Sequence, residues 1–385
     1  MSHFRISASL ALCLLLSSPR GLGAPPMDAA PPLNPPGSAI APEGTTLVQM
    51  WSEHVLLDAS RGVSVPVAVT ATFRMRNTSA VQESMQVRFP LQFVYVDETT
   101  EAGGEIDDFT VSVDSIPVPT GRVLEPISLE EGTLPIPWAT FPAVFPPASD
   151  VVIEAKYSTY PSAALSGSSQ RLAYMISTGA AWHGPIELVE IDVNLPYRAN
   201  RYNAIVNLSS SDTHLWDSPR WSGPTLAWTE WHVEPTPNDN FNLWIVDPER
   251  WDAVIRAQEA LETPPRTPED FIRLSQAYYE VGAAGKSGAC GRRDICSLSL
   301  QAAQEAHRLF PGSASAIAQA AWMRFVLSSE DPWRAIYSPE SPEQELALKA
   351  LRCELVRALQ IEPSNPTAND IAKNVGDPRD QLKCD

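Results

Sequence analysis

Residues 247–273, DPERWDAVIRAQEALETPPRTPEDFIR, mark the point where the sequence changes from strand-like to helix-like patterns. Before this stretch, apolar residues alternate with polar ones, which is the period of β-strands; after it, the spacing of the apolar residues is that of helices. The sequence therefore predicts a multidomain α and β protein, in which an N-terminal antiparallel β-sandwich region is followed by a C-terminal α-helical domain. The stretch itself contains no catalytic motif.

The composition defines the general class of the protein. The chain has 385 residues, of which 44% are hydrophobic and 19% charged, so it can form two or three domains with substantial cores. Its 36 prolines are roughly twice the average usage, which favours many short strands and turns over one long helical bundle. The formal net charge of -18 repels phosphate backbones and anionic lipid headgroups. We therefore expect no nucleic-acid partner.

The first 45 residues carry a targeting pattern. Residues 6–16 form a short apolar run, and small residues follow at 21–24, as in a secretory signal peptide that covers residues 1–23. The apolar run is too short to serve as a membrane anchor. Residues 24–45 are rich in Pro and Ala without periodicity, which predicts a linker. These segments predict an extracytoplasmic protein, secreted or periplasmic, without a membrane anchor.

Strand patterns fill residues 46–247. Alternation is clearest over residues 63–77 and 225–233. Further short strands are predicted over residues 48–55, 85–91, 109–113, 140–145, 151–157, 172–176 and 186–195. Short strands separated by Gly, Pro and Asp favour an antiparallel β-sandwich over residues 46–160. Residues 161–247 form a second β region, which either belongs to the same sandwich or makes a second one.

Residues at strand ends in the first β region resemble a known domain family. Phe73, Asn77 and the Phe89-Pro90-Leu91 strand end, followed by Phe109 and the turn at residues 113–118, are similar to the opening of the vault/inter-alpha-trypsin type β-sandwich. They also resemble the N-terminal domains of uncharacterised exported bacterial proteins. The lysine-containing segment that follows this turn in the family has no clear counterpart in this sequence. The resemblance implies an extracytoplasmic interaction module without catalytic residues.

Residues 248–385 repeat one order of small residues, apolar residues and proline. Ala253, Ala257 and Ala260-Leu261 precede Pro265, and a similar order returns before Pro311 and Pro363, each time followed by a further predicted helix. This order resembles tetratricopeptide-type repeats, which implies stacked pairs of helices. Ser275 stands where that family usually has Gly, and extra residues separate the paired helices at 283–297 and 328–342. A generic α-helical bundle is the alternative.

The helical domain offers one candidate site. Stacked helix pairs form concave binding faces, and we expect Phe271, Tyr278 and Trp322 to line such a face as a partner groove. The chain contains no nucleophile elbow, phosphate loop, dinucleotide fingerprint or zinc-protease helix motif, and we predict no cofactor and no metal site. The sequence thus favours a non-catalytic exported protein that mediates protein–protein interaction through its β-sandwich and repeat-like helices.

Tryptophans in the second β region support a different hypothesis. Trp182 and His183 lie in a glycine-containing loop, and Trp228 and Trp231 lie on opposite faces of the strand predicted at residues 225–233. Exposed aromatic rings can stack on sugar faces, so these four residues are candidates for carbohydrate or cell-wall binding, with hydrolysis as a further option. The competing interpretation is that the tryptophans are buried in cores.

The cysteines agree with an oxidising compartment. Four remain after residue 23, namely Cys290, Cys296, Cys353 and Cys384, and all lie in the helical domain. Four cysteines allow three pairings, and we predict disulfides between Cys290 and Cys296 and between Cys353 and Cys384. A zinc site is the weaker alternative, because five residues between Cys290 and Cys296 exceed the usual spacing of zinc ligands.

Overall fold

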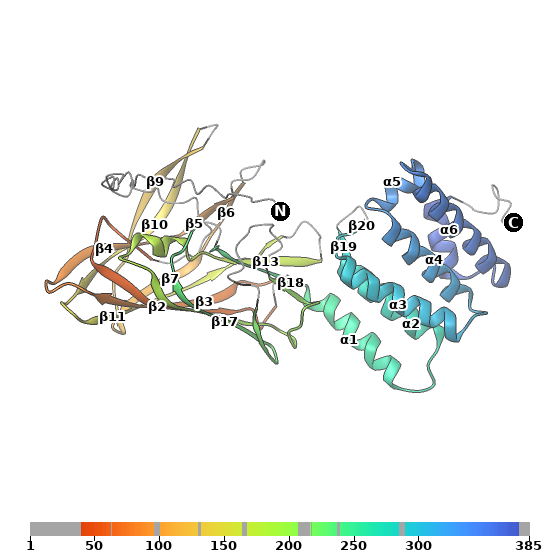
Figure 1. Cartoon of the computed structure of the whole chain (residues 1–385), viewed down its shortest axis with the longest axis horizontal. Helices are drawn as coiled ribbons and strands as arrows, with labels where there is room; N and C mark the ends of the chain where they lie inside the picture. Colours follow the sequence, from red (N-terminus) through yellow and green to blue (C-terminus); the bar gives the residue numbers. More distant parts are fainter. Residues whose placement is uncertain are drawn as a thin grey trace, which may run out of the picture. The chain divides into compact units, whose positions relative to one another are not determined.

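The computed structural model describes residues 40–62, 64–95, 101–129, 132–163, 168–206, 216, 218–236, 239–284 and 289–376. The predicted signal peptide, most of the predicted linker and Cys384 lie outside these ranges. Strands precede residue 247 and α-helices follow it, as the sequence predicts (Figure 1). In Figure 1 the strands run from red to green and the helices from green to blue.

The largest sheet has eight strands in the order β16-β17-β14-β2-β3-β11-β7-β8. In chain order, its strands are β2 (Val48–Asp58), β3 (Val67–Asn77), β7 (Asp107–Val113), β8 (Ile116–Pro117), β11 (Asp150–Thr159), β14 (Ile186–Asn194), β16 (Arg220–Ser222) and β17 (Thr225–Val233). The sheet takes strands from both predicted β regions. Residues 46–160 and 161–247 therefore share one sheet and do not form two separate β domains.

One strand pair departs from the predicted antiparallel arrangement. Strand β14 pairs with β2 in parallel, with Leu188 opposite Ser52 and Asn194 opposite Asp58. A parallel pair requires a long crossover connection, and here the eleven described strands from β3 to β13 lie between β2 and β14 along the chain. Alternation within a strand reveals which residues share a face but not which distant strand lies beside it.

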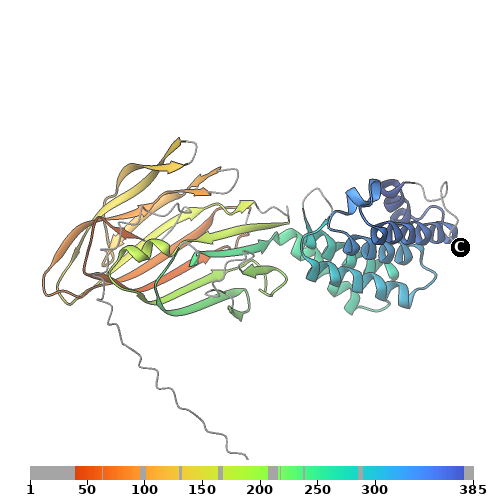
Figure 2. The same cartoon turned by 45° about the horizontal axis from the view of Figure 1, so that its top comes forward.

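Two smaller sheets and a hairpin complete the β part. One sheet has the order β1-β4-β10-β9, the other has the order β12-β13-β18-β15, and β5 pairs with β6. Their bounds are β1 (Ala41–Pro42), β4 (Glu83–Pro90), β5 (Gln92–Tyr95), β6 (Glu101–Glu105), β9 (Gly121–Leu129), β10 (Gly132–Phe145), β12 (Ser162–Ala163), β13 (Ser169–Tyr174), β15 (Ala204–Val206) and β18 (Phe241–Val246). Strands β9 and β10 form a long hairpin, which Figure 2 shows clearly.

The three sheets enclose one hydrophobic core. Phe89 on β4 contacts Tyr157 on β11 with ring centroids 5.4 Å apart, and Trp228 on β17 contacts Phe241 on β18 at 4.8 Å. These pairs join each smaller sheet to the eight-stranded sheet, and burial of such large aromatic side chains is the main stabilising contribution. The fold also begins earlier than predicted. Ile40 is fully buried and β1 pairs with β4, so the last residues of the predicted linker belong to the folded part.

Seven α-helices form the second part. They are α1 (Pro248–Glu262), α2 (Pro268–Gly282), α3 (Arg293–Leu309), α4 (Ala314–Ser328), α5 (Pro332–Tyr337), α6 (Pro342–Ile361) and α7 (Pro366–Val375). Sequence chemistry sets their starts, because all except α3 follow a capping side chain and all except α3 and α4 begin with proline. Helices α1, α3 and α6 end just before Pro265, Pro311 and Pro363, as predicted.

The helices pack in sequence around α4. Helix α1 contacts α2, α2 contacts α3, and α3 contacts α4, while α4 also contacts α2, α6 and α7. Most of α4 is buried, including Ile317, Met323 and Phe325, so this helix is the centre of the helical part. Helices α2, α4 and α7 consequently lie next to one another in that order.

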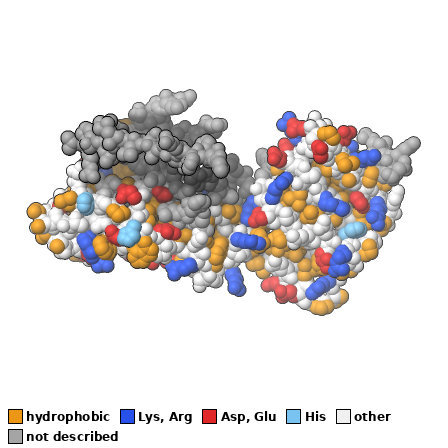
Figure 3. Space-filling model, viewed as in Figure 1, with side chains coloured by type: hydrophobic (Ala, Val, Ile, Leu, Met, Phe, Trp, Pro, Cys, Tyr) orange, Lys and Arg blue, Asp and Glu red, His pale blue; other side chains and the backbone are white. Residues whose placement is uncertain are grey.

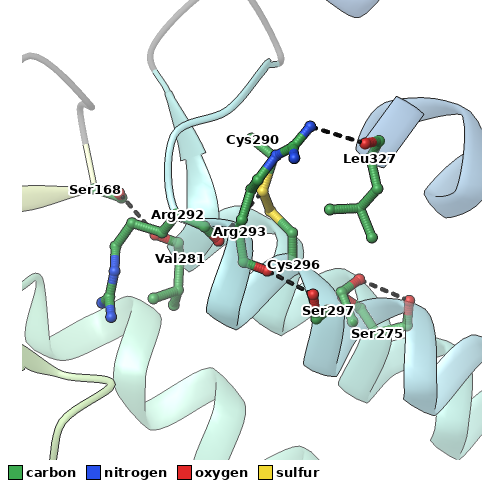
Figure 4. The surroundings of a disulfide bond; sticks show 10 residues. Ser168, Ser275, Val281, Cys290, Arg292, Arg293, Cys296, Ser297 and Leu327 are labelled. Carbon is green, nitrogen blue, oxygen red and sulfur yellow. Dashed lines mark hydrogen bonds between the residues drawn. A yellow bond between two sulfur atoms is a disulfide. The ribbon is translucent and has the colours of Figure 1, made fainter. Parts of the chain in front are cut away.

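A short cross-linked loop lies where α2 ends and α3 begins. Strands β19 (Ala283–Ala284) and β20 (Ala289–Cys290) pair, and the predicted disulfide between Cys290 and Cys296 is confirmed (Figure 4). Gly282 is required beside it, because an added Cβ would lie 2.8 Å from the sulfur of Cys296. Cys353 lies on α6 and Cys384 lies outside the described residues, so their pairing stays a prediction.

Candidate functional site

The helical part contains a groove of about 410 Å³, a volume within the usual range of ligand sites. Helices α2, α4 and α7 contribute most of its surface, and α5 contributes one tryptophan. The lining residues are Gln276, Tyr279, Glu280, Gln319, Trp322, Trp333, Thr367, Asp370, Ile371 and Asn374. The groove therefore brings aromatic, amide and acidic side chains together on one surface.

Helical periodicity explains which side chains of α2 face the groove. Gln276, Tyr279 and Glu280 are spaced by three and four residues, so they share one face of the helix. Tyr278 differs from Tyr279 by about 100° around the helix axis and points to another face. It lies in the core shared with the β part, where its hydroxyl accepts a hydrogen bond from Gln258 Nε2 at 2.7 Å.

Three aromatic side chains form the apolar wall of the groove. Trp322 lies 6.5 Å from Tyr279 and 5.8 Å from Trp333 between ring centroids, with interplanar angles of 82° and 50°. Burial raises the pKa of Tyr279 to about 12, so its hydroxyl is neutral at physiological pH. The rings meet at an angle, and the groove is therefore bordered by aromatic surfaces of more than one orientation.

The charge in the groove has one sign. Glu280 on α2 and Asp370 on α7 are exposed carboxylates, and neither side chain has an ion-pair or hydrogen-bond partner among the described residues. None of the described residues that line the groove is Lys, Arg or His. By contrast, Figure 3 shows basic and acidic side chains interspersed over the face of the helical part that it views. The described lining thus carries two acidic side chains and no basic one, and negative charge of this kind attracts cations.

A buried polar network stiffens the helices behind the groove. Ser275 and Ser299 hydroxyl groups lie 3.0 Å apart, Ser299 also donates to the Ser275 carbonyl at 2.6 Å, and Gln319 Nε2 donates to Ser275 Oγ at 3.1 Å. These contacts join α2, α3 and α4. The serine that replaces the expected glycine at position 275 therefore has a structural role, because it connects three helices.

Of the three residues predicted to line a partner groove, the structure places one in this groove. Trp322 lines the groove, but Tyr278 lies in the core and Phe271 packs against Phe310 at 6.4 Å between ring centroids. Sequence reasoning selected large residues by their order in the repeat and not by helix face. It missed Tyr279 and Trp333. The spacing of Gln276, Tyr279 and Glu280 could have identified Tyr279, whereas no local pattern places α5 beside α4.

Two of the four ligand-binding candidates in the β part are buried. Trp182 is 4% exposed and its indole N–H donates to the Ile40 carbonyl, while Trp228 is 2% exposed and donates to the Trp216 carbonyl. No sugar ring can stack on either side chain, which corrects the hypothesis for these two residues. Their size and their satisfied indole groups make them core residues. His183 is exposed, and its backbone N–H donates to the Val48 carbonyl.

Trp231 is 63% exposed, as the carbohydrate hypothesis requires. The nearest exposed tryptophan in the same sheet is Trp221, which pairs with Leu226. Leu226 and Trp231 are five residues apart on β17, so they lie on opposite faces of the sheet. The two exposed rings consequently face different directions and do not form a sugar-binding platform.

Glu53 on β2 is a buried acid in the core of the β part. Its Oε1 accepts a hydrogen bond from the Tyr174 hydroxyl at 2.7 Å, and its Oε2 has no hydrogen-bond partner among the described residues. Burial raises the pKa of Glu53 to about 8, and the hydrogen bond from Tyr174 opposes this shift only in part. The carboxyl is therefore mostly protonated at neutral pH.

Metal and membrane features are not found in the described residues. No three His, Cys, Asp or Glu side chains of the described ranges gather closely enough to hold a metal ion. The helices that the structure describes include none with the length and apolar character needed to cross a membrane.

Comparisons with known proteins place the chain in no family. No family model matches it, and no curated protein is significantly similar to it. Among solved structures, a proposed nutrient binding protein from Legionella pneumophila is 18% identical, and the match covers 65% of this chain and 85% of that one with a TM-score of 0.44. An M1 zinc metallopeptidase from Deinococcus radiodurans is 10% identical over 83% of this chain and 94% of that one, with a TM-score of 0.27. Similarity at this level identifies neither a family nor an activity.

Proposed function

We propose that this chain is an exported, non-catalytic protein that binds a segment of a protein partner in the groove between α2, α4 and α7. The observation that carries the proposal is the groove itself, in which three aromatic rings, amide side chains and two unpaired carboxylates converge. Among the described residues of the lining there is no Ser, Cys, His or Lys that could act as a nucleophile or imidazole base. Binding is therefore the activity that this set of side chains supports best.

The arrangement of the helices supports this proposal. Helices α2, α4 and α7 each follow a proline and lie next to one another, as the inner helices of irregular tetratricopeptide-like repeats would. Such helices line the concave surface of a repeat array. In the same proposal, the β part is a sandwich that serves as the extracytoplasmic support of the helical part, and the Cys290–Cys296 disulfide agrees with an oxidising compartment.

The proposal can be tested by filling the groove. Gln276 is exposed on the groove face of α2, so Gln276→Trp should obstruct the groove without disturbing a core. Gln301 is exposed on α3 and does not line the groove, and Gln301→Trp is therefore the matched control. The partner is first captured with the wild-type chain and then purified. We expect it to bind Gln301→Trp as tightly as the wild type and to bind Gln276→Trp roughly tenfold more weakly or worse.

Two results would contradict the proposal. The first is a purified partner that binds the wild type and the Gln276→Trp variant equally well, because the partner would then use another surface. The second is the absence of any purified partner with measurable affinity for the wild-type chain. Circular dichroism of both variants must match that of the wild type for the comparison to hold.

A further inference from the structure

The chemistry of the groove specifies the kind of segment that fits it. We infer that the partner segment is an extended peptide that places a basic side chain, Lys or Arg, against the aromatic wall of Tyr279, Trp322 and Trp333 between Glu280 and Asp370. This inference rests on the proposed function and names the chemical class of the partner.

The charges in the groove favour a basic segment. Glu280 and Asp370 belong to the two outer helices of the groove, α2 and α7, and Trp322 belongs to the central helix α4. A cation at the centre would thus have a carboxylate on either side, and none of the described lining residues is a base that would compete for them. The chain carries a formal net charge of -18, which also attracts basic segments at long range. An acidic segment would be repelled by the same groups.

The aromatic wall of the groove also favours a cation. The faces of Trp and Tyr rings attract cations, and the attraction grows when the cation is partly removed from water. Tyr279 and Trp333 are half-buried and supply accessible ring surface, whereas Trp322, which meets them at angles of 82° and 50°, is 8% exposed and offers only a small part of its ring. Because Tyr279 stays neutral and its burial raises its pKa, it contributes a ring face without adding charge of its own. The combination of rings and carboxylates favours an organic cation over an apolar side chain.

The length of the groove fits a peptide segment. Neighbouring packed helices are ~8–10 Å apart, so the groove from α2 across α4 to α7 spans roughly 16–20 Å, which is the length of about five or six extended residues. A single small cation would fill only its centre. Gln276 and Asn374 are exposed at the two outer helices, where amide groups can pair with the N–H and C=O groups of a peptide backbone. The groove therefore suits a peptide segment with a central basic residue.

The test uses four synthetic peptides and the purified chain from residue 24. The peptides have the sequence Ser-Gly-Ala-X-Ala-Gly-Ser with blocked ends, in which X is Lys, Arg, Gln or Glu, and calorimetric titration measures their affinities. We expect the Lys and Arg peptides to bind roughly tenfold more tightly than the Gln peptide, and the Glu peptide to bind most weakly. Added salt should reduce the preference, because it screens the carboxylates.

Matched variants locate the effect in the groove. The double variant Glu280→Gln/Asp370→Asn should reduce the preference for Lys over Gln to less than about threefold, since it keeps the rings and removes both charges. The control double variant, Asp252→Asn/Glu259→Gln, changes the same two residue types at exposed positions of α1 and should retain the preference. Thermal unfolding of both variants checks that the helical part stays folded.

Several outcomes would overturn the inference. Equal affinity for the Lys and Gln peptides, no detectable affinity for any peptide, or an equal loss in both double variants would each exclude it. Spermidine serves as the small-cation probe, and a spermidine affinity equal to that of the Lys peptide would show that no peptide segment is required. The proposed function can hold even when this inference fails. If Gln276→Trp weakens a purified partner while Glu280→Gln/Asp370→Asn does not, the groove binds a protein but selects no basic residue.

Discussion

At the scale of single residues, Glu53 shows how burial couples the stability of the β part to pH. Its folded-state pKa of about 8 exceeds the ordinary value of 4.5, so the folded protein retains a proton that the unfolded chain releases. This group's stabilising contribution is complete below pH 4.5 and is lost as the pH rises toward 8. The slope cannot exceed about 1.4 kcal/mol per pH unit.

We predict that Glu53→Gln removes this part of the pH dependence. The amide side chain keeps an acceptor for the Tyr174 hydroxyl and cannot ionise. Urea unfolding at pH 5 and at pH 8 measures the effect. The difference in unfolding free energy, variant minus wild type, should become more positive by at least about 1 kcal/mol between these two pH values. A difference that stays constant with pH would show that Glu53 is ionised in the folded protein.

Trp228 and Trp231 lie three residues apart on β17 but should respond very differently to truncation. Trp228 is 2% exposed and contacts Phe241, so Trp228→Ala should cost about 3–5 kcal/mol of unfolding free energy. Trp231 is 63% exposed, and Trp231→Ala should change stability by less than about 0.5 kcal/mol. Urea unfolding of the two variants provides the comparison. A large loss in Trp231→Ala would mean that its ring is covered in solution.

At the scale of helices and strands, Ser275 connects α2 to α3 and α4. We predict that Ser275→Ala destabilises the helical part by about 1–3 kcal/mol, because Gln319 Nε2 would lose its buried acceptor. Ser297→Ala is the control, since the Ser297 hydroxyl donates only to the Arg293 carbonyl within its own exposed helix face. Chemical unfolding followed by circular dichroism at the helix band measures both. Equal stability of the two variants would rule out a structural role for the buried serine.

The limits of sequence reasoning are also clearest at this scale. Prolines predicted the ends of α1, α3 and α6, and the alternation of apolar and polar residues predicted strands such as β3. Both signals arise from residues that are close together in the sequence. The parallel pairing of β14 with β2 and the burial of Ile40 under Trp182 depend on residues more than 100 positions apart. Of the three rings in the groove, the sequence identified only that of Trp322. Tyr279 could be recognised only from the face of α2 on which it lies, and Trp333 only from the position of α5.

At the scale of the whole molecule, the described β and helical parts share contacts around the disulfide loop. Ser168 Oγ donates to the Val281 carbonyl at 3.0 Å, and the Arg292 guanidinium donates to the carbonyls of Tyr202 and Arg201 at 2.6 and 3.2 Å. Figure 4 shows the hydrogen bond from Ser168 to Val281 at the end of α2, with the Arg292 side chain close to it. Val281 itself belongs to the core of the β part. The two parts are therefore expected to unfold together.

We predict that Arg292→Ala separates this unfolding into two transitions. Arg292 is half-buried, and burial lowers its pKa while Asp294, which accepts a hydrogen bond from the guanidinium, opposes that shift. Its removal leaves two carbonyl groups without their donor and deletes the contact that the Cys290–Cys296 loop presents to the β part. Arg293→Ala is the matched control, because Arg293 donates to the Leu327 carbonyl inside the helical part. Scanning calorimetry should show one peak for the wild type and the control and two for the variant.

Two peaks in the wild type would mean that these contacts do not couple the parts, and one peak in Arg292→Ala would mean that Ser168 and the shared core suffice without the guanidinium.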